Sequence, residues 1–310
     1  MEKHIISKNE TNALKGIAII IVVLGHFARF SGSSIPLASH VSYYGAALFA
    51  FLSGYGTLIS YIDHGEKINS LWFVNKLIRV YIPFVIVNVV SLPLYKANDK
   101  SIIEKILLGS NDFIMWYPKF IMLFYFIFGV VVILHSKIRV KILLMAFTGI
   151  ICYIVLAILK MDSQYYTSIF ALLAGMWLAL EEKVFKKLNQ TICLISISII
   201  TIVTALASLN TSGWIKYIFV SLSGMSCSIL FLLTIINVRK FTKVCTSFSL
   251  LGLYSYFCYL THMKVFYMID KYMVILSVPA FVTFVLGTII VAYITTTLYN
   301  FALKNIKIKN

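Results

Sequence analysis

Residues 14–27 read LKGIAIIIVVLGHF, an apolar run with a lysine near one end and a histidine near the other. Lys15 and His26 are eleven residues apart, about three helical turns, so they fall within roughly 20° of each other on the helix surface. An ionisable side chain at membrane depth is costly unless it is paired or hydrated. The stretch therefore predicts a membrane helix with a functional face.

The composition extends this prediction to the whole chain. Of its 310 residues, 60% are hydrophobic and 12% are charged, and the mean hydropathy is +0.92. Soluble domains carry about 25% charged residues. We therefore predict an all-α polytopic membrane protein with a single transmembrane domain over residues 1–310. The net charge of +16 does not indicate nucleic-acid binding, because the basic residues recur in short clusters between apolar runs.

Two other readings of the sequence are disfavoured. The five cysteines show no CxxC spacing, so we expect neither a disulfide framework nor a metal site. No small-residue cleavage site follows the first apolar run, and further apolar segments come after it. We therefore expect an uncleaved first transmembrane helix rather than a signal peptide.

Each membrane crossing needs about 20 mostly apolar residues, and the chain offers ten such segments. They lie near 13–30, 41–62, 72–95, 113–134, 141–159, 164–181, 190–209, 213–236, 246–268 and 276–302. Residues 209–213 fit a tight turn, and residues 96–112 leave room for a short interfacial helix.

The distribution of lysine and arginine supports this count and predicts an orientation. The two termini and the even-numbered loops hold sixteen of these residues, whereas the odd-numbered loops hold five. Cytoplasmic loops are enriched in lysine and arginine. Both termini are therefore predicted to be cytoplasmic.

Polar residues inside the predicted spans indicate the chemistry. His26 lies at depth and can act as a general base. Lys76 and Arg79 begin the third span three residues apart, hence on one face, and Pro83 bends that helix and opens backbone groups to a cavity. Together with Lys15 they predict a polyanion site at the cytoplasmic edge, in which Arg79 suits phosphate. Two alternatives stay open: the cations set topology by snorkelling, and His26 bonds a neighbouring helix.

Five stretches carry a resemblance to a known family. LKGIAIIIVVLGHF resembles the first-helix signature of the membrane-bound acyltransferase-3 family, in which a basic residue precedes a histidine. Four further stretches are similar to family segments in order and spacing: ALFAFLSGYGTLIS (47–60), FVNKLIRVYIP (73–83), MWYPKFIMLFYF (115–126) and LLGLYSYFCYLTHMKVF (250–266). The first and last are the most specific.

The resemblance implies an activity and roles for particular residues. Members transfer acyl groups, mostly acetyl from acetyl-CoA, to hydroxyls of surface polysaccharides and other molecules. Catalysis then falls on His26, and binding of the acetyl-CoA donor falls on Lys15, Lys76 and Arg79. The implied partners are acyl-CoA, a glycan or lipid-linked sugar acceptor and the lipid bilayer, with no nucleic acid and no metal. The implied location is the bacterial cytoplasmic membrane.

Three positions depart from the commonest family pattern. Lys15 stands where many members have arginine, Lys76 replaces the first arginine of the third-span pair, and Asn12 stands where an aspartate is frequent. The lysine form resembles the branch of fucose and capsule-sugar O-acetylases. A lysine is a point charge rather than a bidentate fork, so its contacts with the donor differ from those of arginine.

Four more residues are predicted to contact substrate, each with a structural alternative. His262 fits acceptor orientation or proton relay, or else a hydrogen bond to a neighbouring helix. Trp116 fits stacking on a sugar ring, or else the aromatic belt at the membrane interface. Ser53 fits either a substrate contact or close helix packing beside Gly54. Tyr256 belongs to the same family-like segment as His262.

The hypothesis for the mechanism is that His26 deprotonates a sugar hydroxyl, which then attacks the thioester carbonyl. A transporter or flippase of a glycan or lipid-linked precursor is the main alternative, because it also uses buried cations and a histidine. Many transporters show paired halves with interrupted helices in matching places, and no such halves are evident in the sequence. A non-catalytic membrane sensor is a third class, and it would not require a buried base.

Overall fold

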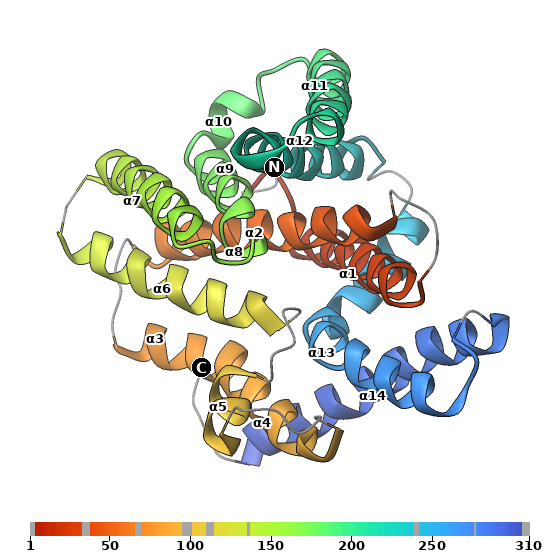
Figure 1. Ribbon diagram of the computed structural model, residues 1–310. Coiled ribbons are helices and arrows are strands. Elements are labelled where there is room, and N and C mark those ends of the chain that lie inside the picture. The colour runs from red at the N-terminus through yellow and green to blue at the C-terminus, as the bar shows by residue number, and fades with distance from the viewer. Residues whose placement is uncertain are drawn as a thin grey trace.

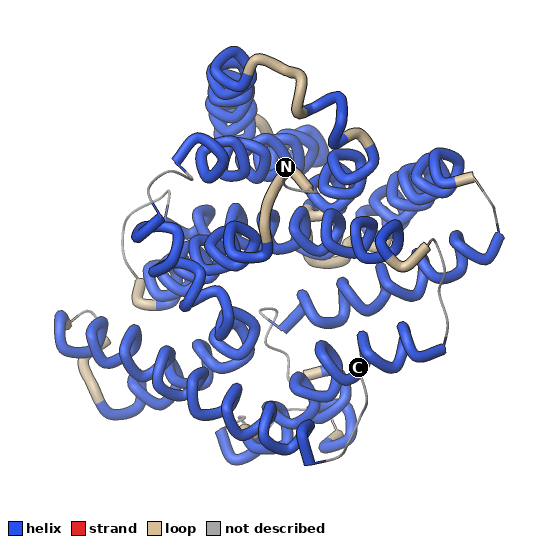
Figure 2. Tube along the Cα trace, turned by 180° about the vertical axis from the view of Figure 1, so that it is seen from behind, coloured by secondary structure: helices blue, strands red, loops and turns tan. Residues whose placement is uncertain are grey.

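The computed structural model describes residues 4–32, 38–65, 70–94, 101–109, 115–134, 137–238, 242–275 and 277–305. Every regular element in these ranges is a helix (Figure 2), which confirms the all-helical prediction. Several basic residues that support the predicted orientation lie outside the described residues: Lys3, Lys67, Lys96, Lys100, Arg239, Lys240, Lys307 and Lys309.

The elements follow one another in chain order (Figure 1). They are α1 (Lys8–Phe30), α2 (Ala38–Asp63), α3 (Ser70–Lys76), the π-helix η1 (Leu77–Tyr81), α4 (Ile82–Val90), the 3-10 helix η2 (Leu92–Leu94), α5 (Ile102–Leu108), α6 (Trp116–Leu134), α7 (Ile138–Ile158), α8 (Gln164–Thr167), α9 (Ile169–Leu180), α10 (Glu182–Phe185), α11 (Gln190–Asn210), α12 (Gly213–Val238), α13 (Thr242–Tyr272) and α14 (Val278–Asn305).

Eight helices in the described residues are long and apolar enough to cross a membrane. They correspond to all the predicted spans except the sixth and the ninth. The sixth, predicted at 164–181, is interrupted between α8 and α9 and is shorter than the others. The ninth, predicted at 246–268, lies in α13, the longest helix at 31 residues. Eight of the ten predicted spans therefore correspond to such helices among the described residues, and the crossings at the other two segments stay predictions.

Burial explains why α13 is less apolar than the other long helices. Thr261, His262 and Lys264 are each 5% exposed or less, so these polar side chains face protein and not lipid. Two smaller predictions agree with the structure. The short helix expected within 96–112 is α5, and a short turn joins α11 to α12, where Gly213 adopts a φ of +59°.

A capping box fixes the beginning of α1. The Ser7 hydroxyl accepts a hydrogen bond from the Glu10 backbone N–H at 3.2 Å, and the Glu10 carboxylate accepts one from the Ser7 N–H at 2.7 Å. These two bonds satisfy N–H groups that a helix start otherwise leaves without partners. The sequence Ser-Lys-Asn-Glu thereby sets the register of the helix that carries Lys15 and His26.

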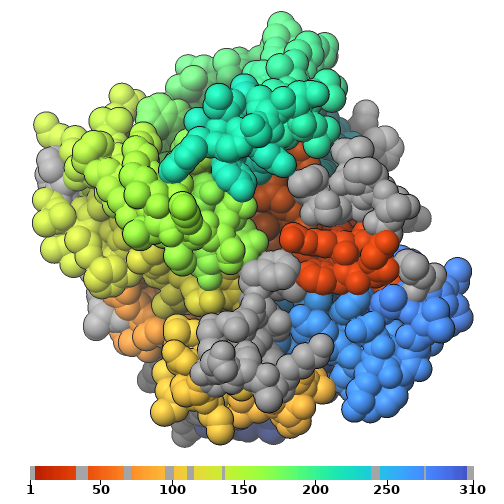
Figure 3. Space-filling model, in the orientation of Figure 1, coloured from red at the N-terminus to blue at the C-terminus, as the bar shows by residue number. Residues whose placement is uncertain are grey.

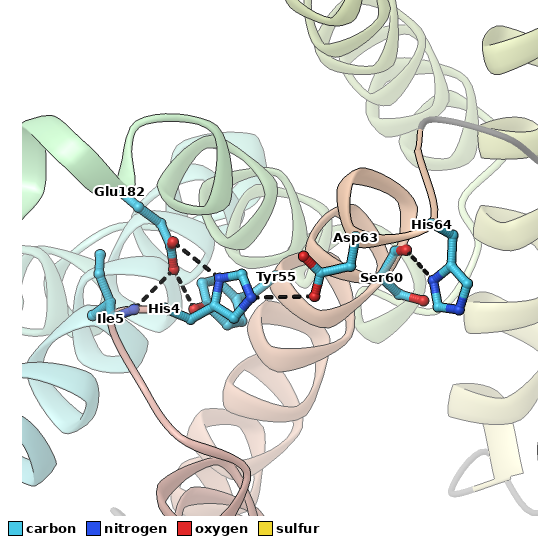
Figure 4. A network of polar contacts seen from close by, with 7 residues as sticks. All are labelled: His4, Ile5, Tyr55, Ser60, Asp63, His64 and Glu182. Atoms are coloured by element: carbon cyan, nitrogen blue, oxygen red, sulfur yellow. Dashed lines mark hydrogen bonds and ion pairs between the residues drawn. The ribbon is translucent and has the colours of Figure 1, made fainter. Parts of the chain in front are cut away.

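The N-terminal segment is tied to the ends of two other helices (Figure 4). His4 Nδ1 lies 3.2 Å from a Glu182 carboxylate oxygen, and His4 Nε2 lies 3.2 Å from an Asp63 oxygen. The Ile5 N–H donates to Glu182 at 3.0 Å, and the Tyr55 hydroxyl donates to the same oxygen. These contacts hold the approach to α1 against the end of α2 and the beginning of α10.

Helices α1 and α2 lie at the centre of the molecule (Figure 1). Helix α1 packs against α2 and α13, and α2 packs against α9 and α12. Helix α14 packs against α13, and its Phe281 and Phe284 rings also meet Phe27 of α1, while α11 packs on α12. On the face shown in Figure 3, part of the α1 surface is visible between the surfaces of α12 and of α13 and α14.

Glycines allow the central helices to approach closely. A Cβ atom on Gly16 of α1 would lie 2.0 Å from the carbonyl oxygen of Phe248, and one on Gly252 of α13 would lie 1.9 Å from that of Asn12. These distances are far below a van der Waals contact, so each position has room only for hydrogen. Small residues at such crossings let membrane helices pack backbone to backbone.

The same device recurs at two other crossings. Between α2 and α9, a Cβ on Gly54 would meet the Leu172 carbonyl oxygen at 2.1 Å, and one on Gly175 would meet that of Phe51 at 2.0 Å. Gly25 and Gly45 play the same part between α1 and α2. The sequence suggested close helix packing at Gly54, and the structure shows that Gly54 has this role.

The third predicted span contains an irregular turn caused by its proline. The Ile82 N–H bonds to the Leu77 carbonyl, five residues earlier, which makes Leu77–Tyr81 a π-helix. In that register the Ile78 carbonyl would need a donor from Pro83, which has no N–H. The Ile78 carbonyl is thus left without a backbone donor, as predicted, but it meets the Tyr299 hydroxyl of another helix and not a cavity.

Tyrosine hydroxyls from two other helices satisfy this turn. Tyr299 of α14 donates to the Ile78 carbonyl, and Tyr256 of α13 donates to the Val80 carbonyl at 2.6 Å. Irregular backbone at membrane depth is tolerated only where such partners exist. The structure therefore places Tyr256, predicted to contact substrate, against the π-helix.

The glycine crossing of α1 and α13 leads to a stability prediction. We expect Gly252→Ala to lower the melting temperature by roughly 5 °C or more, because the new methyl group overlaps backbone that cannot move aside. The measurement is thermal unfolding of the purified protein in detergent. Gly56→Ala is the matched control, since a Cβ on Gly56 meets nothing within 4 Å. Equal melting of the two variants would contradict the role assigned to Gly252.

Candidate active site: a histidine pair, a cavity and a cation cluster

Two histidines from distant parts of the chain meet at the α1–α13 interface. His26 Nδ1 lies 2.7 Å from His262 Nε2, and the two ring planes are within 8° of parallel. His262 is fully buried, whereas His26 is half-buried and lines a cavity. The structure thus brings together the two histidines that the sequence singled out.

The hydrogen-bond partners assign the protons of the neutral pair. His262 Nδ1 lies 2.7 Å from the Tyr259 carbonyl oxygen and 3.2 Å from that of Cys258. A carbonyl only accepts, so His262 carries its proton on Nδ1 and its lone pair on Nε2. His26 must then donate from Nδ1, which leaves the lone pair of His26 on Nε2. That nitrogen is the one arranged to accept a proton from a bound group.

The cavity beside His26 has a volume of about 270 Å³. Its walls come from α1, α2, α6, α8, α12 and α13, and they combine aromatic, hydroxyl, amide and basic side chains. The aromatic and polar lining residues are Ser42, Tyr43, Trp116, Ser163, Gln164, Thr167, Tyr217 and Tyr259, and the basic ones are Arg29 and Lys216. The cavity is therefore amphipathic, unlike the lipid-facing surface of the bundle.

The break between α8 and α9 forms part of this wall. Ser163, Gln164 and Thr167 all line the cavity, and Ser168 separates α8 from α9. The Tyr43 hydroxyl donates to the Thr167 carbonyl at 2.9 Å. This bond supplies a partner for backbone that the interrupted helix leaves open. The shortened sixth segment thus has a structural reason.

A cluster of three cations lies towards the other end of α1. Lys76 Nζ lies 4.4 Å from the ring centre of Tyr125 and 5.0 Å from that of Trp72, which are cation–π distances. The charges of Arg79 and Lys15 both act on Lys76. The structure therefore assembles the three predicted donor-binding residues from α1, α3 and η1. Lys15 and His26 are roughly 16 Å apart along the α1 axis, from the rise per residue.

A match to a protein family spans the histidine pair, the cavity and the cation cluster. An acyltransferase domain matches residues 9–297. The chain belongs to the acyltransferase-3 family. It is therefore a polytopic membrane acyltransferase. No curated protein and no solved structure matches the chain.

Hydrogen bonds connect the other predicted residues of this acyltransferase to the site. Ser53 Oγ lies 2.9 Å from the Tyr117 hydroxyl, and the Tyr117 N–H donates to the Tyr259 hydroxyl at 3.4 Å. Tyr259 lines the cavity, and its backbone carbonyl accepts from His262 Nδ1. Ser53 is thus connected to the cavity through Tyr117, whereas Trp116 lines the cavity directly.

Several site residues of the acyltransferase were not singled out in the sequence. In the sequence, Arg29 and Lys216 are basic residues within or beside predicted spans, and this position alone could have marked them as candidate site residues. Tyr43 and Gln164 carried none, because tyrosine and glutamine near span ends are ordinary. Tyr125 was quoted within a family-like stretch, but only the folded chain places its ring beside Lys76.

The proton assignment of the histidine pair leads to a spectroscopic prediction. In protein labelled with ¹⁵N-histidine, we expect His26 and His262 each to show a protonated Nδ1 and an unprotonated Nε2 near neutral pH. We expect His262→Ala to shift the Nδ1 resonance of His26, because its acceptor is removed. A protonated Nε2 on His26 in the wild-type protein would contradict the assignment.

Proposed function

We propose that this acyltransferase moves an acetyl group from acetyl-CoA to a hydroxyl of a cell-surface or exported glycan. The observation that carries the proposal is the His26 Nε2 lone pair, directed by His262, beside an amphipathic cavity. The predicted orientation supports a cytoplasmic donor side at Lys15 and an opposite side at the cavity. A multi-pass location in the bacterial cytoplasmic membrane, and membership of the branch resembling fucose and capsule-sugar O-acetylases, belong to the same proposal.

The cation cluster suits the donor. Coenzyme A carries several phosphate charges on its nucleotide end and its thioester on a long flexible arm. Lys15, Lys76 and Arg79 provide three positive charges near one another, and Arg79 offers the fork geometry that matches phosphate. The acyl arm would then run along α1 towards His26. The donor acts as a co-substrate, and the proposal requires no metal.

The cavity suits a sugar acceptor. Trp116, Tyr43 and Tyr217 supply aromatic faces on which the C–H face of a sugar ring packs. Ser42 and Gln164 supply donors and acceptors for its hydroxyls. A few polar groups among apolar walls are the usual composition of a site for a small polar ligand.

The proposed reaction begins with proton removal. His26 Nε2 takes the proton from the sugar hydroxyl as that oxygen attacks the thioester carbonyl carbon. The C–S bond breaks, and the departing CoA thiolate receives the proton from His26 Nε2. The products are the acetyl ester and free CoA. His262 is a positioning residue, because its Nε2 accepts the His26 Nδ1–H and stabilises the imidazolium that forms.

The transporter alternative gains no support from these observations. A transporter does not require a histidine that is held by a second histidine as a proton acceptor beside a cavity lined by aromatic and polar side chains. The family match also favours acyl transfer.

The base role of His26 leads to the main functional prediction. We expect His26→Ala to lower acetyl transfer from acetyl-CoA to glycan by about 10²- to 10⁴-fold, the usual contribution of a positioned base. The measurement is CoA release by membranes, with mass analysis of surface glycans from the same cells. Met122→Ala, on a partly buried core residue that does not line the cavity, controls for non-specific damage. Full acetylation by folded His26→Ala protein would disprove the base role.

The donor site is tested by shortening the donor. We expect Lys76→Gln to raise the KM for acetyl-CoA by about tenfold, because it removes a charged contact with phosphate. With acetyl-pantetheine, which lacks the nucleotide phosphates, we expect the same variant to cost far less.

Lys183→Gln is the matched control for this comparison, since Lys183 is an exposed lysine of α10 and is not part of the cation cluster. Equal losses of Lys76→Gln with both donors would place the defect in folding or in the acyl arm, and would contradict phosphate binding by the cluster.

A further inference from the structure

The acceptor cavity contains two basic side chains that the reaction described above does not use. Arg29 follows His26 by three residues, so both lie on adjacent turns of one face of α1. Lys216 comes from α12, on another wall of the cavity. No aspartate or glutamate occurs among the described residues that line the cavity. Arg29 and Lys216 therefore contribute positive charge to the cavity wall.

Membrane topology does not account for these two cations. The loops on the predicted outer side hold five lysines and arginines, against sixteen on the other side. Basic residues are thus depleted where Arg29 and Lys216 converge. Six basic residues lie within or beside spans, and two of them belong to this one cavity.

The two cations share the cavity with the reacting group. His26 and Arg29 of α1 both line it, and the Arg29 guanidinium also lies 5.8 Å from the centre of the Phe30 ring. Lys216 adjoins Tyr217, and both side chains line the cavity. Asp162 immediately precedes the lining residue Ser163 but does not itself line the cavity. A ligand that reaches His26 through this cavity therefore shares it with two basic side chains.

We propose that the acceptor is an acidic glycan, whose carboxylate or phosphate group binds Arg29 and Lys216 while a nearby hydroxyl faces His26. This inference rests on the proposed function and narrows its substrate class. Arginine binds carboxylate and phosphate through paired N–H groups, and lysine binds them as a point charge. An anion held at Arg29 would fix the sugar one helical turn from the base. The position of the charged group on the sugar would then determine which hydroxyl faces His26.

The test uses matched acceptors with the full chain in lipid nanodiscs and acetyl-CoA as donor. One pair is an oligosaccharide containing uronic acid and its carboxyl-reduced form. The other is an oligosaccharide bearing glycerol phosphate and its dephosphorylated form. We expect one acidic member to be acetylated with a kcat/KM at least about tenfold above that of its neutral partner. Which pair shows the preference distinguishes carboxylate from phosphate.

Variants then connect the preference to the two cations. We expect Arg29→Gln and Lys216→Gln each to reduce the acidic-to-neutral ratio of kcat/KM by about tenfold, mainly through KM. Lys271→Gln is the control, because Lys271 is an exposed lysine at the same end of the bundle and outside the residues that line the cavity. Neutral acceptors used equally well, or a ratio that neither variant changes, would overturn the inference.

A binding measurement separates this inference from the proposed reaction. Without donor, we expect the acidic oligosaccharides to raise the melting temperature of the wild-type protein, and Arg29→Gln with Lys216→Gln to abolish that shift. If this shift occurs but no acetyl transfer follows, the proposed reaction fails while the anion site stands. If acetyl transfer occurs to neutral acceptors without any shift from acidic ones, the anion site fails while the reaction stands.

Discussion

The close approach of α1 to α13 is the constraint on which the site depends. Gly16 and Gly252 face backbone carbonyls at distances that leave no room for a methyl group. Only that approach lets two rings from the same interface meet at 2.7 Å. A wider crossing would separate His26 from His262, and His26 would then lose the acceptor that fixes its tautomer. Packing in this protein therefore decides which nitrogen carries the lone pair.

The irregular backbone follows a second rule, which concerns satisfaction of carbonyl groups. Two of the irregular segments among the described residues are the π-helix at Leu77–Tyr81 and the break between α8 and α9. Tyrosine hydroxyls from other helices bond the exposed carbonyls at both places. The first segment carries Arg79 of the cation cluster, and the second lines the cavity. Irregularity thus occurs where the chain needs polar groups inside the bundle, as expected for membrane proteins.

The sequence predicted those parts of the structure that periodicity and composition control. It predicted the helical class, most of the spans and the loss of a backbone donor at Pro83. It did not predict the interruption at Thr167 and Ser168, because no proline or glycine marks that site. It also did not predict that His262 and Lys264 of α13 are buried in protein, since hydropathy does not reveal which face of a helix meets other helices.

The site was harder to predict because its partners are remote in the chain. His26 and His262 are separated by 236 residues, and nothing local in either segment specifies that their rings meet. Tyr256 illustrates the opposite error. Its position in a family-like segment suggested substrate contact, whereas the fold uses its hydroxyl to bond the Val80 carbonyl. A polar residue near a site can thus hold the scaffold rather than the substrate.

Helix α1 arranges the proposed reaction along a single axis. Lys15, His26 and Arg29 fall within about 60° of one another around the helix, since each residue advances roughly 100°. In the proposed function the first binds the donor, the second moves the proton and the third binds the acceptor. Their spacing is fixed by the helix, so donor and acceptor anchors keep a constant distance from the base. The capping box at Ser7 and the glycine crossings then determine where this axis lies in the bundle.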